Sequence, residues 1–320
     1  MTSTDTRAQF PAEQSDDDGG FRRRESQFRD HVTADGSSGY AAEAGRYHLY
    51  VSYACPWAHR TIIYRHLKGL EDAISMTVVD PERDERGWAV TNAPGTTSDP
   101  VNHFRFLSEA YVATNPAFDG HVSVPVLWDT RTKRIVNNES SEIIRMLDGE
   151  FDAFAKHPER HYLPAALREG IDELNAYVYD NVNNGVYRTG FARTQTAYEK
   201  AFGQLFDALD ELDARLAGSR YLFGDTPTEA DWRLFPTLVR FDPVYVGHFK
   251  CNLRRIADYP QLSGYLRDLY QHPGIAATVD LDQIKRHYYR THPQINPTRI
   301  VPVGPALDLA APHDRAALSG

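Results

Sequence analysis

The spacing of apolar residues predicts a strand that runs directly into a helix. Residues 47–51 alternate aromatic or branched side chains with neighbours on the opposite face, as a β-strand does. From Pro56 apolar residues recur at helical spacing to about Leu67, and proline suits the first position of a helix. Cys55 stands at the junction, where the unpaired N–H groups and the positive dipole end of a helix start favour a thiolate, the reactive form of cysteine.

The pattern beyond this stretch completes a small α/β domain. A second strand is expected at 74–80, and two strands flanking one helix normally lie parallel with a right-handed crossover. Residues 81–120 then interrupt the regular order and are interpreted as an insertion. A β-hairpin follows at 122–129 and 134–138, although Pro125 is unexpected there because proline cannot donate to a sheet ladder.

A helix is expected to begin at Glu139, so the element order is that of a thioredoxin-like domain covering residues 41–150. Beyond a polar connection the pattern becomes helical, which predicts an all-α C-terminal domain at 165–292 and a proline-rich tail at 293–320. The fold class is therefore α/β thioredoxin-like followed by all-α. Its helices are expected at 165–181, 194–217, 228–241, 260–272 and 281–289, and Thr228 and Asp231 have the spacing of a capping box.

Residues 1–40 are polar and are predicted to form a largely flexible extension, in which Phe21 and Phe28 could anchor an arm on the body of the protein. Acidic residues number 44 against 35 basic ones, and the net charge of −9 argues against nucleic acid as a partner. No apolar run has membrane-spanning length, and the acidic N-terminus does not look like a secretory signal.

Two cysteines occur, Cys55 and Cys251, and neither has metal-ligand spacing, so no metal is expected. The low cysteine count favours a reducing cytoplasm. Cys251 lacks the helix-start context of Cys55 and is interpreted as an inert, buried residue.

Several motifs in collinear order give the chain a family resemblance. It resembles the glutathionyl-hydroquinone reductases, the Xi-class relatives of glutathione transferases, over nearly everything from Phe21 to Pro305. The motifs are Cys-Pro-Trp-Ala-His-Arg at 55–60, Gly87-Trp88, SVPVLWD at 123–129, NNESSEIIRM at 137–146, DNVNNGVYRTGFA at 180–192 and INPTRIVPVGP at 295–305.

The resemblance implies a thiol-binding half-site in the first domain. Cys55 matches the family nucleophile, and Ala58 stands where a dithiol enzyme has its second cysteine, so a second small thiol must regenerate the enzyme. Pro125 matches the cis-proline of thioredoxin-like folds, which lets the backbone of Val124 pair with glutathione. Trp88 matches a tryptophan that packs over the thiol.

Glu139 and Ser140 match the positions that hold the γ-glutamyl ammonium and carboxylate, although both residues could also serve only as helix caps. Where the family pattern has an arginine this chain has His121, and Arg83, Arg86 or Arg105 is expected to supply the missing anionic contact.

The helical half is expected to bind the quinol. By the resemblance, Tyr187, Tyr245 and Tyr288 surround the aromatic acceptor, and Tyr187 is the candidate general acid. The implied partners are glutathione, as co-substrate, or a similar small thiol, a glutathionyl-quinol substrate and a second copy of the chain in a homodimer.

Two other functions stay open on the sequence. An omega-like thioltransferase or dehydroascorbate reductase would use the same Cys55 chemistry on other substrates. A non-catalytic binding module would have the glutathione transferase fold only as an interaction surface, and its Cys55 would be unreactive.

Overall fold

The computed structural model describes residues 14–319, which form two compact units. Unit 1 comprises Arg24–Arg160 and Asp282–Pro293. Unit 2 comprises Gln14–Arg23, His161–Leu281 and the chain from Gln294 onward. The main break near residue 160 lies in the connection where the sequence predicts the change from α/β to all-helical structure.

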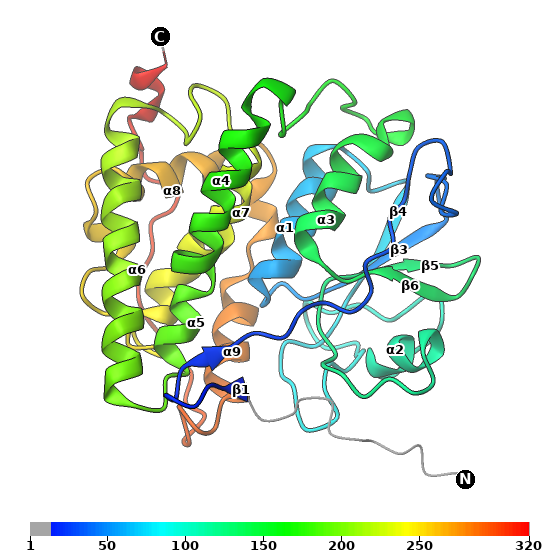
Figure 1. Cartoon of the computed structure of the whole chain (residues 1–320), viewed down its shortest axis with the longest axis horizontal. Coiled ribbons are helices and arrows are strands. Elements are labelled where there is room, and N and C mark those ends of the chain that lie inside the picture. The colour runs from blue at the N-terminus through cyan, green and yellow to red at the C-terminus, as the bar shows by residue number, and fades with distance from the viewer. Residues whose placement is uncertain (1–13, 320) are drawn as a thin grey trace. The chain divides into compact units, whose positions relative to one another are not determined.

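Unit 1 is built on a four-stranded sheet of order β4-β3-β5-β6. The central strand β3 pairs in parallel with β4 and antiparallel with β5, which in turn pairs antiparallel with β6. Figure 1 shows α1 and α3 side by side against this sheet. The predicted β-α-β unit and hairpin are confirmed. Their bounds are β3 Tyr47–Val51, α1 Pro56–Leu67, β4 Ile74–Val78, α2 Ser108–Thr114, β5 Val126–Asp129, β6 Arg134–Asn137 and α3 Ser140–Arg145.

The strand predicted from residue 122 is shorter than expected. Strand β5 begins at Val126, and the peptide bond between Val124 and Pro125 is cis, as the resemblance implies. The prediction of a strand through Pro125 is therefore wrong, because the proline nitrogen has no hydrogen to donate to the ladder.

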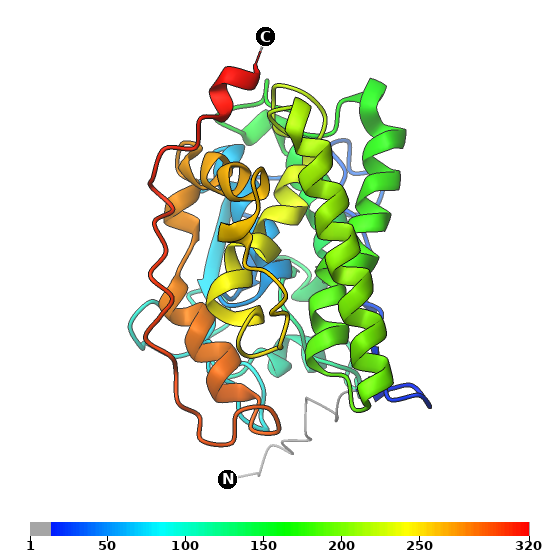
Figure 2. The same ribbon diagram turned by 90° about the vertical axis from the view of Figure 1, so that its left-hand side faces the viewer.

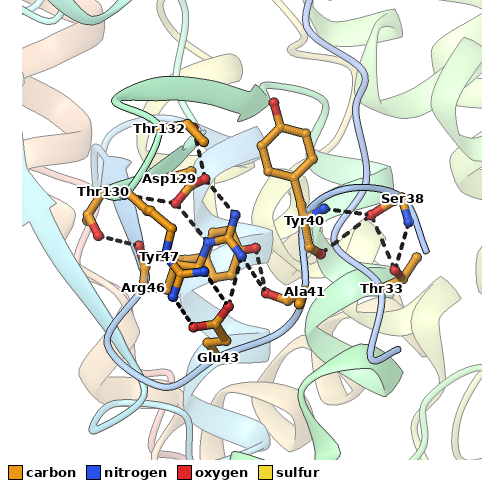
Figure 3. A network of polar contacts seen from close by, with 11 residues as sticks. Thr33, Ser38, Tyr40, Ala41, Glu43, Arg46, Tyr47, Asp129, Thr130 and Thr132 are labelled. Carbon is orange, nitrogen blue, oxygen red and sulfur yellow. Dashed lines mark hydrogen bonds and ion pairs between the residues drawn. The ribbon is translucent and has the colours of Figure 1, made fainter. Parts of the chain in front are cut away.

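The start of β3 is tied to the end of β5 by a buried ion pair (Figure 3). Arg46 donates from Nε and Nη2 to the two carboxylate oxygens of Asp129, at 2.9 and 2.8 Å, and also pairs with Glu43 at 3.0 Å. Asp129 lies opposite Tyr47 in the strand register. This pair therefore fixes the register of the two central strands, whose other ends lead to Cys55 and to Val124.

Part of the N-terminal segment that the sequence predicts to be largely flexible makes defined contacts with unit 1. Residues 24–40 lie on unit 1, where Arg29 bridges to Asn137 of the edge strand β6 and Val32 is buried. Phe28 packs against the ring of Tyr111 at 5.6 Å, so its predicted role as an anchor is confirmed. The backbone of β6 supplies partners that polar composition does not reveal. Residues 1–13 lie outside the described part of the chain.

Residues 14–23 form a short hairpin in unit 2, with strands β1 Gln14–Ser15 and β2 Phe21–Arg22. Phe21 contacts the ring of Tyr187 at 6.3 Å, which confirms the second predicted anchor. The rest of unit 2 is helical, and Figure 2 shows its long helices side by side. The α-helices are α4 Arg168–Val178, α5 Gly185–Gly190, α6 Gln195–Arg215, α7 Glu229–Arg240 and α8 Leu262–Gln271.

Several of these α-helices end earlier than the sequence predicts, because the chain continues from them into π or 3-10 turns. The π-turns are Met146–Glu150 after α3, Tyr179–Asn183 after α4 and Phe241–Tyr245 after α7; the 3-10 turns are Asp152–Phe154, Ala165–Leu167, Leu216–Gly218, Ile256–Asp258, Ile275–Thr278 and Arg315–Leu318. The capping box at the start of α7 is confirmed, with Asp231 accepting from the Thr228 backbone at 2.7 Å.

The last predicted helix belongs to unit 1, which corrects its assignment to the helical domain. Helix α9, Leu281–Thr291, contacts the insertion at residues 81–120. His287 Nδ1 lies 2.6 Å from the Pro81 carbonyl oxygen, and Gln283 donates to the Gly95 carbonyl at 2.8 Å. These polar contacts hold α9 on unit 1, and they could not be predicted from the helical spacing of its apolar residues.

The tail is extended, as its prolines predict, and ends in a short 3-10 turn, drawn in red in Figure 2. Within the tail, Arg315 is buried and donates to the carbonyls of Leu216 and Ser219. Among the helices formed by residues 14–319, none combines the length and apolar character needed to cross a bilayer.

Candidate functional site

Cys55 occupies the N-cap of α1 in unit 1. Its backbone is extended, its carbonyl accepts the first helical hydrogen bond from His59, and Pro56 takes the first helical position. The side chain is half-buried. Its sulfur lies 3.5 Å from the carbonyl oxygen of Val124. The thiol therefore stands where the helix dipole favours an anion and beside the loop that precedes the cis-proline.

The loop that contains Ser123 and Val124 is hydrogen-bonded to the buried side chain of Tyr111. The Tyr111 hydroxyl donates to the Ser123 carbonyl at 2.7 Å and accepts from the Ser123 backbone N–H at 3.1 Å. Burial raises the pKa of Tyr111, so its hydroxyl keeps its proton and remains a donor. Val124 itself is buried, and the register of Tyr50 with Val126 places the loop next to the end of β3.

The start of α3 supplies the predicted acidic and hydroxyl groups. Glu139 is the N-cap, and its Oε1 accepts from the Ser141 backbone N–H at 3.1 Å and from its hydroxyl at 2.8 Å. The capping function that the sequence left open is thus present. Ser140 is buried and accepts at Oγ from Arg60 Nη1 at 3.4 Å. Because Arg60 lies on α1, this contact links the helix of Cys55 to the helix of Glu139.

Trp88 contacts the guanidinium of Arg83 and the imidazole of His287, which lies on α9 of the same unit. Its ring stacks on the imidazole of His287 with centroids 5.2 Å apart, and the guanidinium carbon of Arg83 lies 4.9 Å from its ring centroid. Of the other arginines expected near the thiol, Arg86 pairs with Asp84 and Arg105 is exposed.

Of the three predicted tyrosines, Tyr288 lies in unit 1 and the other two in unit 2. Tyr288 is buried next to His287 on α9. Tyr187 and Tyr245 have ring centroids 6.2 Å apart, and both contact Phe249 at 5.5 Å. Tyr245 is fully buried and Tyr187 is half-buried.

Within unit 1 Cys55 contacts Val124, and Arg60 on the helix of Cys55 contacts Ser140. Within unit 2 Tyr187 and Tyr245 lie side by side. Sequence reasoning missed Arg60, His287 and Ser26, whose hydroxyl contacts Glu139. Arg60 stands inside the quoted motif at 55–60 and could have been found there. His287 and Ser26 leave no signal in spacing, because their partners are distant in the chain.

Cys251 is buried, and burial raises its pKa far above the usual range of a thiol. Neither cysteine is in a disulfide. Across residues 14–319, no cluster of three or more histidine, cysteine or acidic side chains is arranged to hold a metal ion. A half-buried thiol at a helix N-cap, such as Cys55, is suited to nucleophilic attack.

Two protein-family models match the chain, one in each of its two parts. A family model described as "Glutathione S-transferase, N-terminal domain" matches residues 54–150, and one described as "Glutathione S-transferase, C-terminal domain" matches residues 195–268.

Individual relatives match over nearly their whole length. The chain is 52% identical to Glutathionyl-hydroquinone reductase YqjG of Escherichia coli (strain K12), covering 93% of the chain and 92% of the relative. It is 53% identical to Glutathionyl-hydroquinone reductase PcpF of Sphingobium chlorophenolicum, covering 91% of each. It is also 47% identical to Glutathione S-transferase omega-like 2 of Schizosaccharomyces pombe (strain 972 / ATCC 24843), covering 91% of the chain and 95% of that protein.

Solved structures agree with these matches. The glutathione-bound structure of YqjG from Escherichia coli K-12 superposes with a TM-score of 0.88 at 53% identity, covering 90% of this chain and 96% of that one. The Xi class glutathione transferase from Natrialba magadii superposes with a TM-score of 0.90 at 52% identity, covering 95% and 96%.

Proposed function

The chain belongs to the glutathionyl-hydroquinone reductases, the Xi class of the glutathione transferase family, and on that premise we propose that it removes glutathione from glutathionyl-hydroquinones through a mixed disulfide on Cys55. The observation that carries the proposal is the placement of a single half-buried thiol at a helix N-cap, 3.5 Å from the Val124 carbonyl. The predicted thioredoxin-like and all-helical architecture is the glutathione transferase fold.

The reaction consists of two sulfur transfers. The Cys55 thiolate attacks the thioether sulfur of the conjugate, the carbon–sulfur bond breaks with its electron pair on the aromatic carbon, and that carbon takes up a proton. The products are free hydroquinone and Cys55 joined to glutathione by a disulfide. A second glutathione thiolate attacks the glutathione sulfur of that disulfide, which releases oxidised glutathione and restores the Cys55 thiolate.

The thiol half-site assigns one role to each group around Cys55. The backbone of Val124 pairs with the cysteinyl part of glutathione, and Ser140 receives the α-carboxylate of its γ-glutamyl end. Glu139 receives the ammonium, and Trp88 packs over the thiol ligand. Support comes from the contacts of Cys55 with Val124 and of Arg60 with Ser140.

The quinol half-site is assigned to three tyrosines. By the motif match, each of Tyr187, Tyr245 and Tyr288 is assigned a contact with the quinol, and Tyr187 is assigned the delivery of the proton to the leaving carbon. Their support is the motif match and, for Tyr187, its half-buried position beside Tyr245.

Turnover of glutathionyl-menadiol, compared between the native protein and Cys55→Ser, tests the proposal. We expect the substitution to abolish hydroquinone release while glutathione binding persists, because the hydroxyl is too weak a nucleophile. Full activity in Cys55→Ser would overturn the assignment. Cys251→Ser is the matched control and should keep full activity.

A second candidate function is thioltransfer of the omega type, favoured by the 47% identity to the omega-like protein of Schizosaccharomyces pombe. Rates on hydroxyethyl disulfide and dehydroascorbate separate the two functions. Faster turnover of these substrates than of glutathionyl-menadiol would favour thioltransfer. An unreactive Cys55 would instead indicate a binding module.

We assign the protein to the reducing cytoplasm, where glutathione is kept largely as the free thiol that the second step consumes. We also propose a homodimer, as the resemblance implies, and sedimentation equilibrium of the full chain tests it. A monomeric mass across micromolar concentrations would contradict it.

A further inference from the structure

The N-terminal arm, defined as residues 24–34, touches the thiol half-site at a residue that no motif identifies. The Ser26 hydroxyl lies 3.1 Å from Glu139 Oε2 and 3.2 Å from the Asn138 carbonyl oxygen. We propose that Ser26 is a positioning residue that orients the Glu139 carboxylate toward the ammonium of the γ-glutamyl group. This inference rests on the proposed function, which assigns Glu139 to that ammonium.

The acceptor inventory of Glu139 shows why its orientation matters. A carboxylate offers about four acceptor positions on its two oxygens. Ser141 fills two of them at Oε1 with its backbone N–H and its hydroxyl. Ser26 fills a third at Oε2. The carboxylate is therefore held from both sides, and the bonds that it makes within residues 14–319 leave a position at Oε2 for an ammonium N–H.

The arm is fixed firmly enough to place a hydroxyl. Phe28 donates from its N–H to the Asn138 side-chain oxygen at 3.1 Å, and its carbonyl accepts from the Asn138 N–H at 3.0 Å. The Asp30 N–H donates to the Val136 carbonyl at 3.0 Å. Arg29 forms a two-pronged ion pair with Glu142 on α3.

Phe28 also connects the arm to the other side of the half-site. Its ring packs on Tyr111, whose hydroxyl holds Ser123 next to Val124 and accepts from Asn138 Nδ2 at 3.2 Å. The same short segment thus contacts the elements that carry Glu139 and Val124. An arm without a functional role would need only its backbone pairing with β6, whereas Ser26 adds a side-chain bond to the one acidic group of the half-site.

The test measures glutathione affinity by calorimetry in a Cys55→Ser parent, which binds without reacting. Ser26→Ala should weaken glutathione binding roughly 3- to 10-fold, as expected for one hydrogen bond to a charged group that is partly exposed. Ser26→Thr keeps a hydroxyl and should restore the affinity to within about twofold. Ser38→Ala is the matched control, because Ser38 lies farther along the N-terminal segment and is hydrogen-bonded to Thr33 and Tyr40 of the same segment.

A ligand that lacks only the amine separates positioning from folding. Glutaryl-cysteinyl-glycine is glutathione without its ammonium, so Ser26→Ala should leave its affinity unchanged. A double-mutant cycle adds a second criterion, because Ser26→Ala should have no further effect on glutathione when Glu139→Gln is present. Equal weakening of both ligands, or no weakening of glutathione, would overturn the role of Ser26.

Failure of the proposed function has a different signature. If the native protein binds glutathione but does not turn over glutathionyl-menadiol, the reductase assignment is wrong and the calorimetric result for Ser26 still decides this inference. If the Cys55→Ser parent does not bind glutathione, both the assignment and the inference are wrong.

Discussion

Removing one partner of the Arg46–Asp129 pair should destabilise unit 1 strongly. Both side chains are buried, with relative exposures of 6% and 0%, and they share two hydrogen bonds at 2.9 and 2.8 Å. Breaking such a pair by truncating one side leaves the other charge desolvated, which typically costs about 3–5 kcal/mol. Glu43 stays 3.0 Å from Arg46, so Asp129→Ala should fall near the lower end, at about 3 kcal/mol.

The assay is urea unfolding of Asp129→Ala, Arg46→Ala and the double variant, followed by far-UV circular dichroism and tryptophan fluorescence. Since each single variant strands one charge, the double variant should be more stable than the sum of the single losses predicts, by roughly 2 kcal/mol or more. Strict additivity of the two losses would refute the reasoning. Arg131→Ala, which removes an exposed partner of Glu43, is the control and should cost less than about 1 kcal/mol.

Acid should weaken the same pair. Burial of the Asp129 carboxyl opposes ionisation, but the hydrogen bonds from Arg46 and Thr132 outweigh it and hold the pKa below its usual value of 3.8. A carboxyl with a depressed folded pKa contributes stability above that value, and the contribution is lost as pH falls through the folded pKa. The native protein should therefore lose this stability below about pH 4, and Asp129→Ala should lack that part of the transition.

Three further predictions concern titration, reactivity and catalysis. Burial lowers the pKa of His48 from 6.5 to about 4, so as pH falls the unfolded chain binds the proton before the folded protein does. The free energy of unfolding should therefore fall by about 3 kcal/mol between pH 6.5 and pH 4. His48→Gln should reduce this pH dependence in urea unfolding, and an unchanged pH dependence would contradict the prediction. Iodoacetamide should label Cys55 but not Cys251 in the native protein at pH 7.5, and peptide mapping that finds Cys251 labelled first would contradict the burial argument. Tyr187→Phe should lower kcat about 10²- to 10⁴-fold with glutathione affinity unchanged, and an unaltered kcat would remove Tyr187 from the proton transfer.

Local patterns in the sequence were sufficient to predict the strand and helix that flank Cys55. Alternation over residues 47–51 and the Pro56 helix start are properties of neighbouring residues, and both elements have the expected bounds. The capping box of Thr228 and Asp231 was predictable for the same reason. Motif order was sufficient for the family, since the chain matches its relatives over more than 90% of its length.

Features that depend on distant partners were not predictable. The composition of the N-terminal arm predicts flexibility. The arm is nevertheless placed by hydrogen bonds between Asp30 and residues 136 and 137 of β6, which lie more than a hundred residues away in the chain. Helix α9 has the periodicity of the helical domain, yet the polar contacts of His287 and Gln283 with the insertion place it in unit 1. Arg315 in the tail is fixed by carbonyls of the turn after α6, which spacing does not reveal.

The central claim is that Cys55 carries glutathione during turnover. Mass spectrometry of the native protein, mixed with glutathionyl-menadiol in the absence of free glutathione and digested under acid quench, tests it most directly. We expect one glutathione per chain, located on the peptide that contains Cys55 and removed by added glutathione with release of oxidised glutathione. Free menadiol formed in stoichiometric amount without any adduct on Cys55, or with the adduct on Cys251, would contradict it.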